Sequence, residues 1–317
     1  MATLVPRVHL LQAQGQGCPG LRFLEPEAFV EELTRLSFAI VCCPKEVAQP
    51  VACAMQRAEA LLSIPAATGL CLNYKRQKDL KQRLQVRRTG QDLQASAEDD
   101  PRVLASSFEV MEAVAQASME AWCDSQGVPT QAAKSHFGDL SFGEEAYPEQ
   151  GQQGQESAIG KGKSVLNLYH YFNQDPSEEP CRQHADPGLV TVLCLSSTKK
   201  GLEVRLPLRP GGAPGKSATY DEEWQDVEAA MDSALSTKRT ARAEPESERS
   251  GRSGRSGQDE FCFLVIAGET LERLSAGQHP ACLHRVAHIS EPRFNMAFEL
   301  RPRCNVWHPW QQLEKAP

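Results

Sequence analysis

The stretch HADPGLVTVL, residues 184–193, decides how the rest of the sequence is interpreted. It ends in an apolar, β-branched run that predicts a buried strand. In extended backbone the side chains repeat every two residues, so His184 and Asp186 project from the same face just before that strand. An imidazole and a carboxylate placed in this way can chelate one cation.

A second histidine that could complete such a site is His284, in the stretch HPACLHRVAHI, residues 279–289. Two imidazoles and one carboxylate form the ligand set of non-haem Fe(II) sites, which leave positions open for other ligands. The His-x-Asp pair alone is weak, because in a chain with 8 histidines such a pair arises by chance about as often as not. An isolated pair is more often a hydrogen-bonded surface feature, so the surrounding sequence has to decide.

Five strand-like apolar runs follow one another in the second half of the chain. They are residues 165–172, 189–195, 201–207, 261–267 and 293–300. Glycine and proline separate these runs, and no helical pattern lies between them, which favours a β-sandwich or a jelly roll.

The first 125 residues show helical spacing instead. Apolar residues predict helices over residues 25–36, 44–62 and 101–127, and the run 38–43 predicts a buried strand between the first two helices. We therefore expect an α+β fold with a double-stranded β-helix (jelly-roll) core and an N-terminal helical layer.

Composition divides the chain further. We expect an N-terminal helical region packing on the barrel at 1–143, a linker or mobile loop at 144–163, the jelly-roll domain at 164–304, and a C-terminal tail at 305–317. Residues 233–258 have no Val, Ile or aromatic residue and end in SGRSGRSG. Such a segment buries too little apolar surface to offset the entropy of ordering, so we expect a disordered insertion there.

Overall charge and cysteine usage exclude several classes of protein. The chain has 34 Lys and Arg against 41 Asp and Glu, a net charge of −7, which argues against a general nucleic-acid binder. No apolar run approaches the ~20 residues of a membrane span. The 11 cysteines are odd in number and include no C-x-x-C pair. We expect buried, reduced thiols in a cytoplasmic protein, with a small-molecule substrate and a monomeric state.

A basic run, KRQKDLKQRLQVRR at residues 75–88, stands out against this acidic background. The simplest interpretation is a solvated helix or loop face. The alternative is an electropositive rim that attracts an anionic substrate.

The motifs together resemble those of the isopenicillin N synthase-like family of Fe(II)/2-oxoglutarate dioxygenases. In this sequence they are NLY (167–169), HADPGLVTVL (184–193), GLEV (201–204), WQDV (224–227), GETLERLSAG (268–277), HRV (284–286) and RFN (293–295). They occur in the family's order over about residues 165–303, which makes the match specific.

The resemblance implies that His184, Asp186 and His284 bind iron, with no catalytic residues beyond these ligands. Arg293 would bind the distal carboxylate of 2-oxoglutarate, because a guanidinium fork can donate two parallel hydrogen bonds to a carboxylate. The spacing from His284 to Arg293 is that of isopenicillin N synthase, an oxidase that uses no 2-oxoglutarate.

Three further residues are implied at the 2-oxoglutarate end of the site. Tyr169 would add a hydroxyl donor, and Asn167 would line the same end. Asn295 stands where the family usually has serine, and its longer amide places a donor differently.

The implied function is oxidation of an organic substrate, by hydroxylation or desaturation, with Fe(II), O₂ and 2-oxoglutarate, releasing succinate and CO₂. Two alternatives stay open, which are an oxidase without 2-oxoglutarate and a non-catalytic barrel used for binding. A zinc hydrolase fits less well, because it leaves Arg293 unexplained. The sequence does not identify the substrate.

Overall fold

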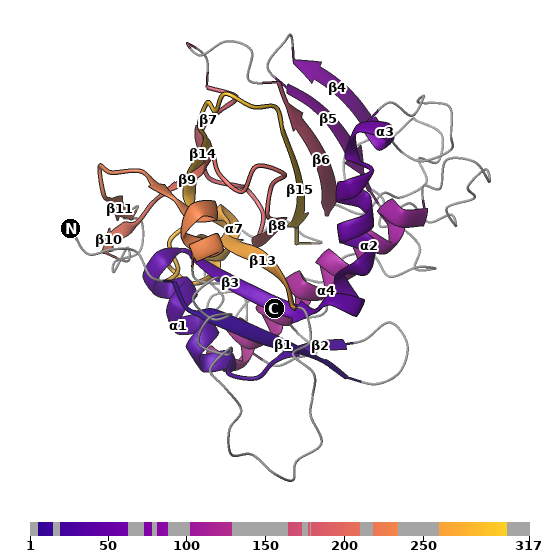
Figure 1. The fold of residues 1–317 in the computed structure, drawn as a ribbon. Coiled ribbons are helices and arrows are strands. Elements are labelled where there is room, and N and C mark those ends of the chain that lie inside the picture. Colours follow the sequence, from indigo (N-terminus) through magenta and orange to yellow (C-terminus); the bar gives the residue numbers. More distant parts are fainter. Residues whose placement is uncertain are drawn as a thin grey trace, which may run out of the picture.

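The computed structural model describes residues 6–14, 20–62, 73–77, 81–87, 102–128, 164–172, 177, 179–209, 218–233 and 260–302. Two facing β-sheets form its centre, and helices cover the outer side of the larger sheet (Figure 1). Two of the candidate metal ligands, His184 and His284, lie on the smaller sheet.

The main sheet has nine strands in the order β2-β1-β3-β13-β8-β15-β6-β5-β4. Its strands are β1 (Val8–Gln14), β2 (Gly20–Phe23), β3 (Phe38–Pro44), β4 (Asn73–Gln77), β5 (Lys81–Val86), β6 (Val165–Tyr171), β8 (Val190–Cys194), β13 (Glu260–Ala267) and β15 (Arg293–Leu300). Neighbouring strands are antiparallel except for β1 and β3, which are parallel. The N-terminal region therefore supplies five strands to this sheet as well as helices.

The second sheet has four strands in the order β12-β9-β14-β7. Its strands are β7 (Cys181–His184), β9 (Leu202–Arg205), β12 (Gln225–Asp226) and β14 (Leu283–Val286), and β10 (Pro207–Arg209) pairs separately with β11 (Thr219–Tyr220). Apolar side chains from both sheets, such as Leu193, Leu264 and Val204, form one buried cluster between them. This arrangement is the expected double-stranded β-helix.

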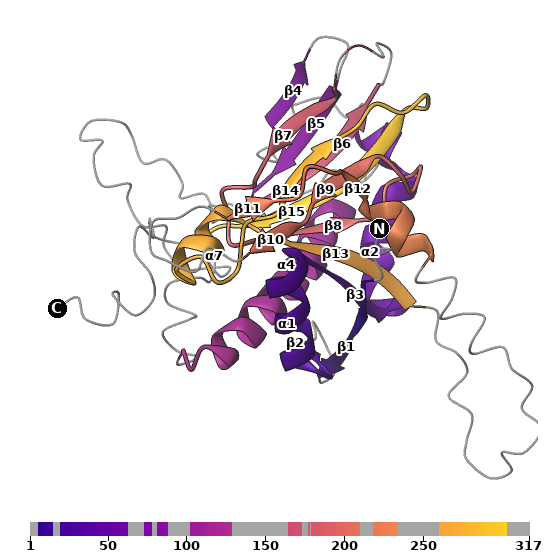
Figure 2. The same cartoon turned by 90° about the vertical axis from the view of Figure 1, so that its left-hand side faces the viewer.

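Helices pack on the outer face of the main sheet, away from the small sheet (Figure 2). They are α1 (Pro26–Leu36), α2 (Lys45–Gln56), α3 (Ala58–Leu62) and α4 (Arg102–Ser125), while α7 (Glu269–Leu274) follows β13. The buried stripe of α4 contacts β8 and β15, where Phe108 meets Phe298 edge to face at 4.9 Å. The single helix predicted over 44–62 is divided at Arg57, whose N–H bonds to both Cys53 and Ala54 carbonyls.

The basic run is not a helix or loop face, because its described residues form β4 and β5 in the main sheet. Side chains alternate along β5. Leu84 and Val86 are buried among the helices, and Gln82 donates to the Leu62 carbonyl. Lys81 and Arg83 alternate with these and face the space between the sheets. The alternation is hidden in the sequence because polar residues occupy most positions on both faces.

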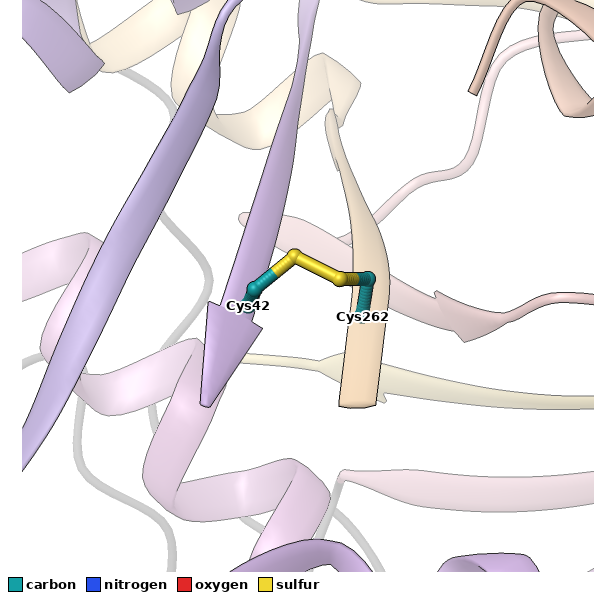
Figure 3. Close-up of a disulfide and its surroundings, with 2 residues drawn as sticks. All are labelled: Cys42 and Cys262. Atoms are coloured by element: carbon teal, nitrogen blue, oxygen red, sulfur yellow. A yellow bond between two sulfur atoms is a disulfide. The ribbon is translucent and has the colours of Figure 1, made fainter. Parts of the chain in front are cut away.

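Cys42 on β3 and Cys262 on β13 form a disulfide, so the expectation of reduced thiols is wrong for this pair (Figure 3). The two residues are 220 apart in sequence and directly opposite in the paired strands. Nothing in the cysteine spacing reveals that contact, because it depends on the pairing of distant strands.

Several sequence predictions lie outside the described residues. These are the linker at 144–163, the insertion over 234–258 and the tail at 305–317. Among the helices that the structure describes, none combines the length and apolar character needed to cross a bilayer.

Candidate active site

The three expected metal ligands come together between the sheets. His184 ends β7 and lies opposite His284 on the neighbouring strand β14, with Asp186 two residues further on. One ligand atom from each lies within 4.8 Å of the others. Asp186 Oδ1 is 3.4 Å from His184 Nε2 and 3.9 Å from His284 Nε2.

Hydrogen bonds behind the ligands orient their donor atoms. His184 Nδ1 lies 2.9 Å from the Arg182 carbonyl, and His284 Nδ1 lies 3.0 Å from the Cys282 carbonyl. A carbonyl can only accept, so each Nδ1 donates and each Nε2 points toward the carboxylate. Thr191 Oγ1 donates to Asp186 Oδ2 at 2.6 Å. Two imidazole nitrogens and one carboxylate oxygen therefore face one point, which fits a divalent metal such as Fe(II).

The electrostatics of this group keep the Asp186 carboxylate ionised although it is buried. Burial would raise the pKa of Asp186, but the hydrogen bond from His184 and the nearby His284 and Thr191 lower it to about 2. The hydrogen bond to Asp186, with help from Cys181, raises the pKa of His184 to about 10. Burial lowers the pKa of His284. The buried carboxylate thus stays ionised and is stabilised by positive charge.

The loop that carries Asp186 is held against the start of α7. Glu269 N–H donates to the Asp186 carbonyl at 2.8 Å, and Thr270 N–H donates to the Gly188 carbonyl at 3.0 Å. Thr270 Oγ1 also donates to the Pro187 carbonyl at 2.6 Å. Gly268 lies at the crossing of the two loops, which explains why the GETLERL stretch accompanies the His-x-Asp pair.

We expect Gly268→Ala to disturb the metal centre through this crossing. A Cβ atom there would collide with the Gly188 carbonyl group and lie 3.0 Å from the Asp186 carbonyl oxygen. Both obstacles are backbone, so the loop itself must shift. We expect a lower midpoint of urea unfolding and weaker Mn(II) binding, whereas Gly20→Ala, which meets nothing within 4 Å, should change neither.

Arg293, the residue expected to bind 2-oxoglutarate, is 1% exposed at the start of β15. Its Nη2 donates to Glu228 Oε2 at 3.0 Å, and its guanidinium lies 5.4 Å from the ring centre of Tyr171. Its Nε is buried and has no hydrogen-bond partner among the described residues. This unused donor fits a further carboxylate, as the proposed co-substrate requires.

Glu228 is a partner of Arg293 that the sequence did not reveal. It is 2% exposed and lies in the short helix over 227–233. Its Oε1 accepts from Ser196 N–H at 2.8 Å, and its Oε2 accepts from Leu202 N–H at 3.1 Å. The only sequence feature that could have pointed to Glu228 is its position directly after the WQDV motif. A co-substrate carboxylate at Arg293 would therefore share the guanidinium with a fixed anion.

The other expected 2-oxoglutarate residues lie on the same inner face of the main sheet. Asn295 and Tyr169 are directly opposite in β15 and β6. Asn167 accepts from Gln85 at 3.1 Å, and Asn295 donates to the Cys194 carbonyl at 2.9 Å. Burial raises the pKa of Tyr169 to about 12, despite the nearby positive charge of Arg83, so its hydroxyl stays protonated.

Asn295→Ser should lower stability, because Asn295 is 3% exposed and its amide bonds to a carbonyl of the next strand. A serine hydroxyl is too short to keep that bond. We expect a loss of about 1–3 kcal/mol in the free energy of unfolding, as for one buried acceptor left without its partner. Urea unfolding measures this, and an unchanged midpoint would show that Asn295 does not stabilise the sheet.

His170 lies away from the site although it follows Tyr169. It packs against Phe172 and Phe294, with ring centres 4.5 and 4.2 Å away. The two-residue repeat of the strand places these rings on the face opposite to Tyr169. His170 therefore does not line the space between the sheets.

Known structures share this architecture. A 2-oxoglutarate complex of the dioxygenase for auxin oxidation 1 from Arabidopsis thaliana matches 98% of this chain and 97% of its own, with 13% identity and a TM-score of 0.58. A full-length Neurospora crassa protein in complex with α-ketoglutarate and thymine matches 87% of this chain and 80% of its own, with 15% identity and a TM-score of 0.54. The chain has the fold of the 2-oxoglutarate–Fe(II) oxygenases.

This likeness confirms the fold inferred from the motifs. It is structural only, since no protein-family model matches the sequence and no curated protein matches it significantly. The roles of individual residues therefore rest on the geometry of the site in this oxygenase fold.

Proposed function

We propose that the protein is an Fe(II)- and 2-oxoglutarate-dependent dioxygenase that oxidises a small organic molecule. The observation that carries this proposal is the convergence of His184, Asp186 and His284 on one point between the sheets of an oxygenase fold. Arg293, with an unused buried donor on the facing sheet, supports it.

Each part of the chain has a distinct task in this proposal. The two histidines and Asp186 would hold Fe(II), and Thr191 would keep the Asp186 carboxylate turned toward the metal. Arg293 would bind the distal carboxylate of 2-oxoglutarate, and the apolar cluster between the sheets would keep the site dry. When bound, iron and 2-oxoglutarate supply the oxidising chemistry, with loss of CO₂ and release of succinate.

The test begins without a substrate. Calorimetry on Mn(II)-substituted protein should show about one metal per chain, and then 2-oxoglutarate binding that depends on the metal. Aerobic Fe(II)-protein should next be screened against organic compounds for succinate release. Metal binding with O₂ consumption but no succinate would favour the oxidase, and no metal binding would favour a non-catalytic barrel. Tight Zn²⁺ binding without 2-oxoglutarate binding would favour a hydrolase.

A further inference from the structure

Two cations on β5 face the space between the sheets. The inward side chains of β5 are Lys81, Arg83 and Gln85, opposite Tyr171, Tyr169 and Asn167 of β6. Gln85 already donates a hydrogen bond to Asn167. Neither Lys81 nor Arg83 forms an ion pair with any acid that the structure describes. The proposed dioxygenase reaction leaves both residues unassigned.

Lys81 is linked to one of the candidate metal ligands through Cys181. Lys81 Nζ is 3.5 Å from Cys181 Sγ, which is 3.9 Å from His184 Nδ1. Arg83 lies opposite Tyr169 in the strand pair and its charge acts to lower the pKa of that hydroxyl, while its Nε is buried and has no partner in the described part of the chain. A half-buried guanidinium with a buried, unused Nε donor is poised for an acceptor from a bound molecule.

The 2-oxoglutarate proposed at Arg293 does not account for these cations. Arg293 and Lys81 lie on either side of β6, on β15 and β5. Tyr171 of β6 contacts both, with its ring centre 5.4 Å from the Arg293 guanidinium and 5.9 Å from Lys81 Nζ. With 2-oxoglutarate at Arg293, a second anionic group on the β5 side of Tyr171 would balance the charges of Lys81 and Arg83.

We propose that the substrate is an organic carboxylate, and that Arg83 and Lys81 bind its carboxylate group. The proposal rests on the dioxygenase function and names the substrate class of that site. A guanidinium fork suits a carboxylate, because two parallel N–H donors match its two oxygens. Lys81 adds a second, point-like charge. In a chain with a net charge of −7, this local positive potential would also attract an anion to the site.

The experiment uses matched pairs of small organic acids and their carboxamides, which differ in charge but hardly in shape. Thermal unfolding of the full chain, loaded with Mn(II) and 2-oxoglutarate without O₂, identifies the compounds that stabilise it. Calorimetry then gives their affinities. We expect the stabilising compounds to be acids, with affinities at least about tenfold above those of their amides.

The variants Arg83→Gln and Lys81→Gln should each weaken acid binding by about tenfold or more and leave 2-oxoglutarate binding unchanged. Arg83→Lys, which keeps the charge but loses the fork, should fall between wild type and Arg83→Gln. Arg83→Lys also tests the proposal if Arg83→Gln does not fold. Arg205→Gln is the matched control, because Arg205 lies 4.7 Å from the Trp224 ring centre and alternates along β9 with Leu202 and Val204, which face the inner cluster.

Three results would overturn the proposal. They are equal stabilisation by acids and amides, no stabilisation by any acid, and a loss of 2-oxoglutarate rather than acid binding in Arg83→Gln. The proposed dioxygenase function can be tested independently of the substrate class. If wild type binds no Mn(II) or 2-oxoglutarate, the dioxygenase function is wrong, whereas binding of both without any acid preference makes only the substrate class wrong.

Discussion

Replacing Asp186 with alanine should abolish tight binding of Fe(II) or Mn(II). The carboxylate is the one anionic ligand in the group and lies within 4 Å of both histidine Nε2 atoms, at 3.4 and 3.9 Å. Its loss leaves two neutral imidazoles, which hold a divalent cation poorly. Replacing a residue that hydrogen-bonds to a metal ligand typically lowers metal affinity by about 10–100-fold. We expect calorimetry to show a larger loss for Asp186→Ala.

Two variants make this result specific. Thr191→Val removes only the hydroxyl that donates to Asp186 Oδ2 at 2.6 Å, so it should show the smaller, about 10–100-fold loss. Asp232→Asn removes an acid from a surface pair with Lys199 and should bind metal like wild type. Unchanged metal binding by Asp186→Ala would show that the metal lies elsewhere.

The second large effect concerns the binding of 2-oxoglutarate at Arg293. Arg293→Ala alone is a poor test, because it leaves the buried Glu228 carboxylate without its cation. Breaking such a pair costs about 3–5 kcal/mol of stability. The double variant Arg293→Met and Glu228→Gln removes both charges. It should fold, bind Mn(II) normally and lose 2-oxoglutarate affinity by about 30-fold to several thousand-fold, equivalent to about 2–5 kcal/mol.

Glu228→Gln alone separates the contribution of the Arg293–Glu228 pair to stability from its effect on 2-oxoglutarate binding. Without the competing carboxylate, the full charge of Arg293 is available, so 2-oxoglutarate should bind more tightly than to wild type. The variant should also be less stable in urea until 2-oxoglutarate is added. Calorimetry on Mn(II)-loaded protein without O₂ measures the affinity, and urea unfolding measures the stability. If the double variant binds 2-oxoglutarate as wild type does, Arg293 is not its binding residue.

The sequence predicted what is local or periodic. The pair of His184 and Asp186 is only two residues apart, and the strands now seen as β6, β8, β13 and β15 are apolar runs that can be recognised without their partners. Hence the barrel and the three ligand candidates could be predicted. The helices α1 and α4 were likewise visible in their apolar stripes.

Features that depend on distant pairing could not be predicted. The bond between Glu228 and Arg293 spans 65 residues, and the contact of Lys81 with Cys181 spans 100. The simplest interpretation of the basic run, a solvated helix or loop face, is wrong, because charge in a sequence says nothing about whether a side chain faces solvent or the inside of a barrel. Only the register of β5 against β6 places Arg83 opposite Tyr169.

The order of strands in the main sheet has a consequence for folding during synthesis. β3 pairs with β13, which comes more than 200 residues later, as the 220-residue separation of Cys42 and Cys262 shows. The apolar strand β3 therefore leaves the ribosome long before its antiparallel neighbour exists. β1 precedes β3 and can pair with its other edge, but at about 5–20 residues per second the edge that faces β13 stays unpaired for at least about ten seconds. We expect the nascent chain to depend on chaperones during this interval, and chains that stop before β13 to aggregate.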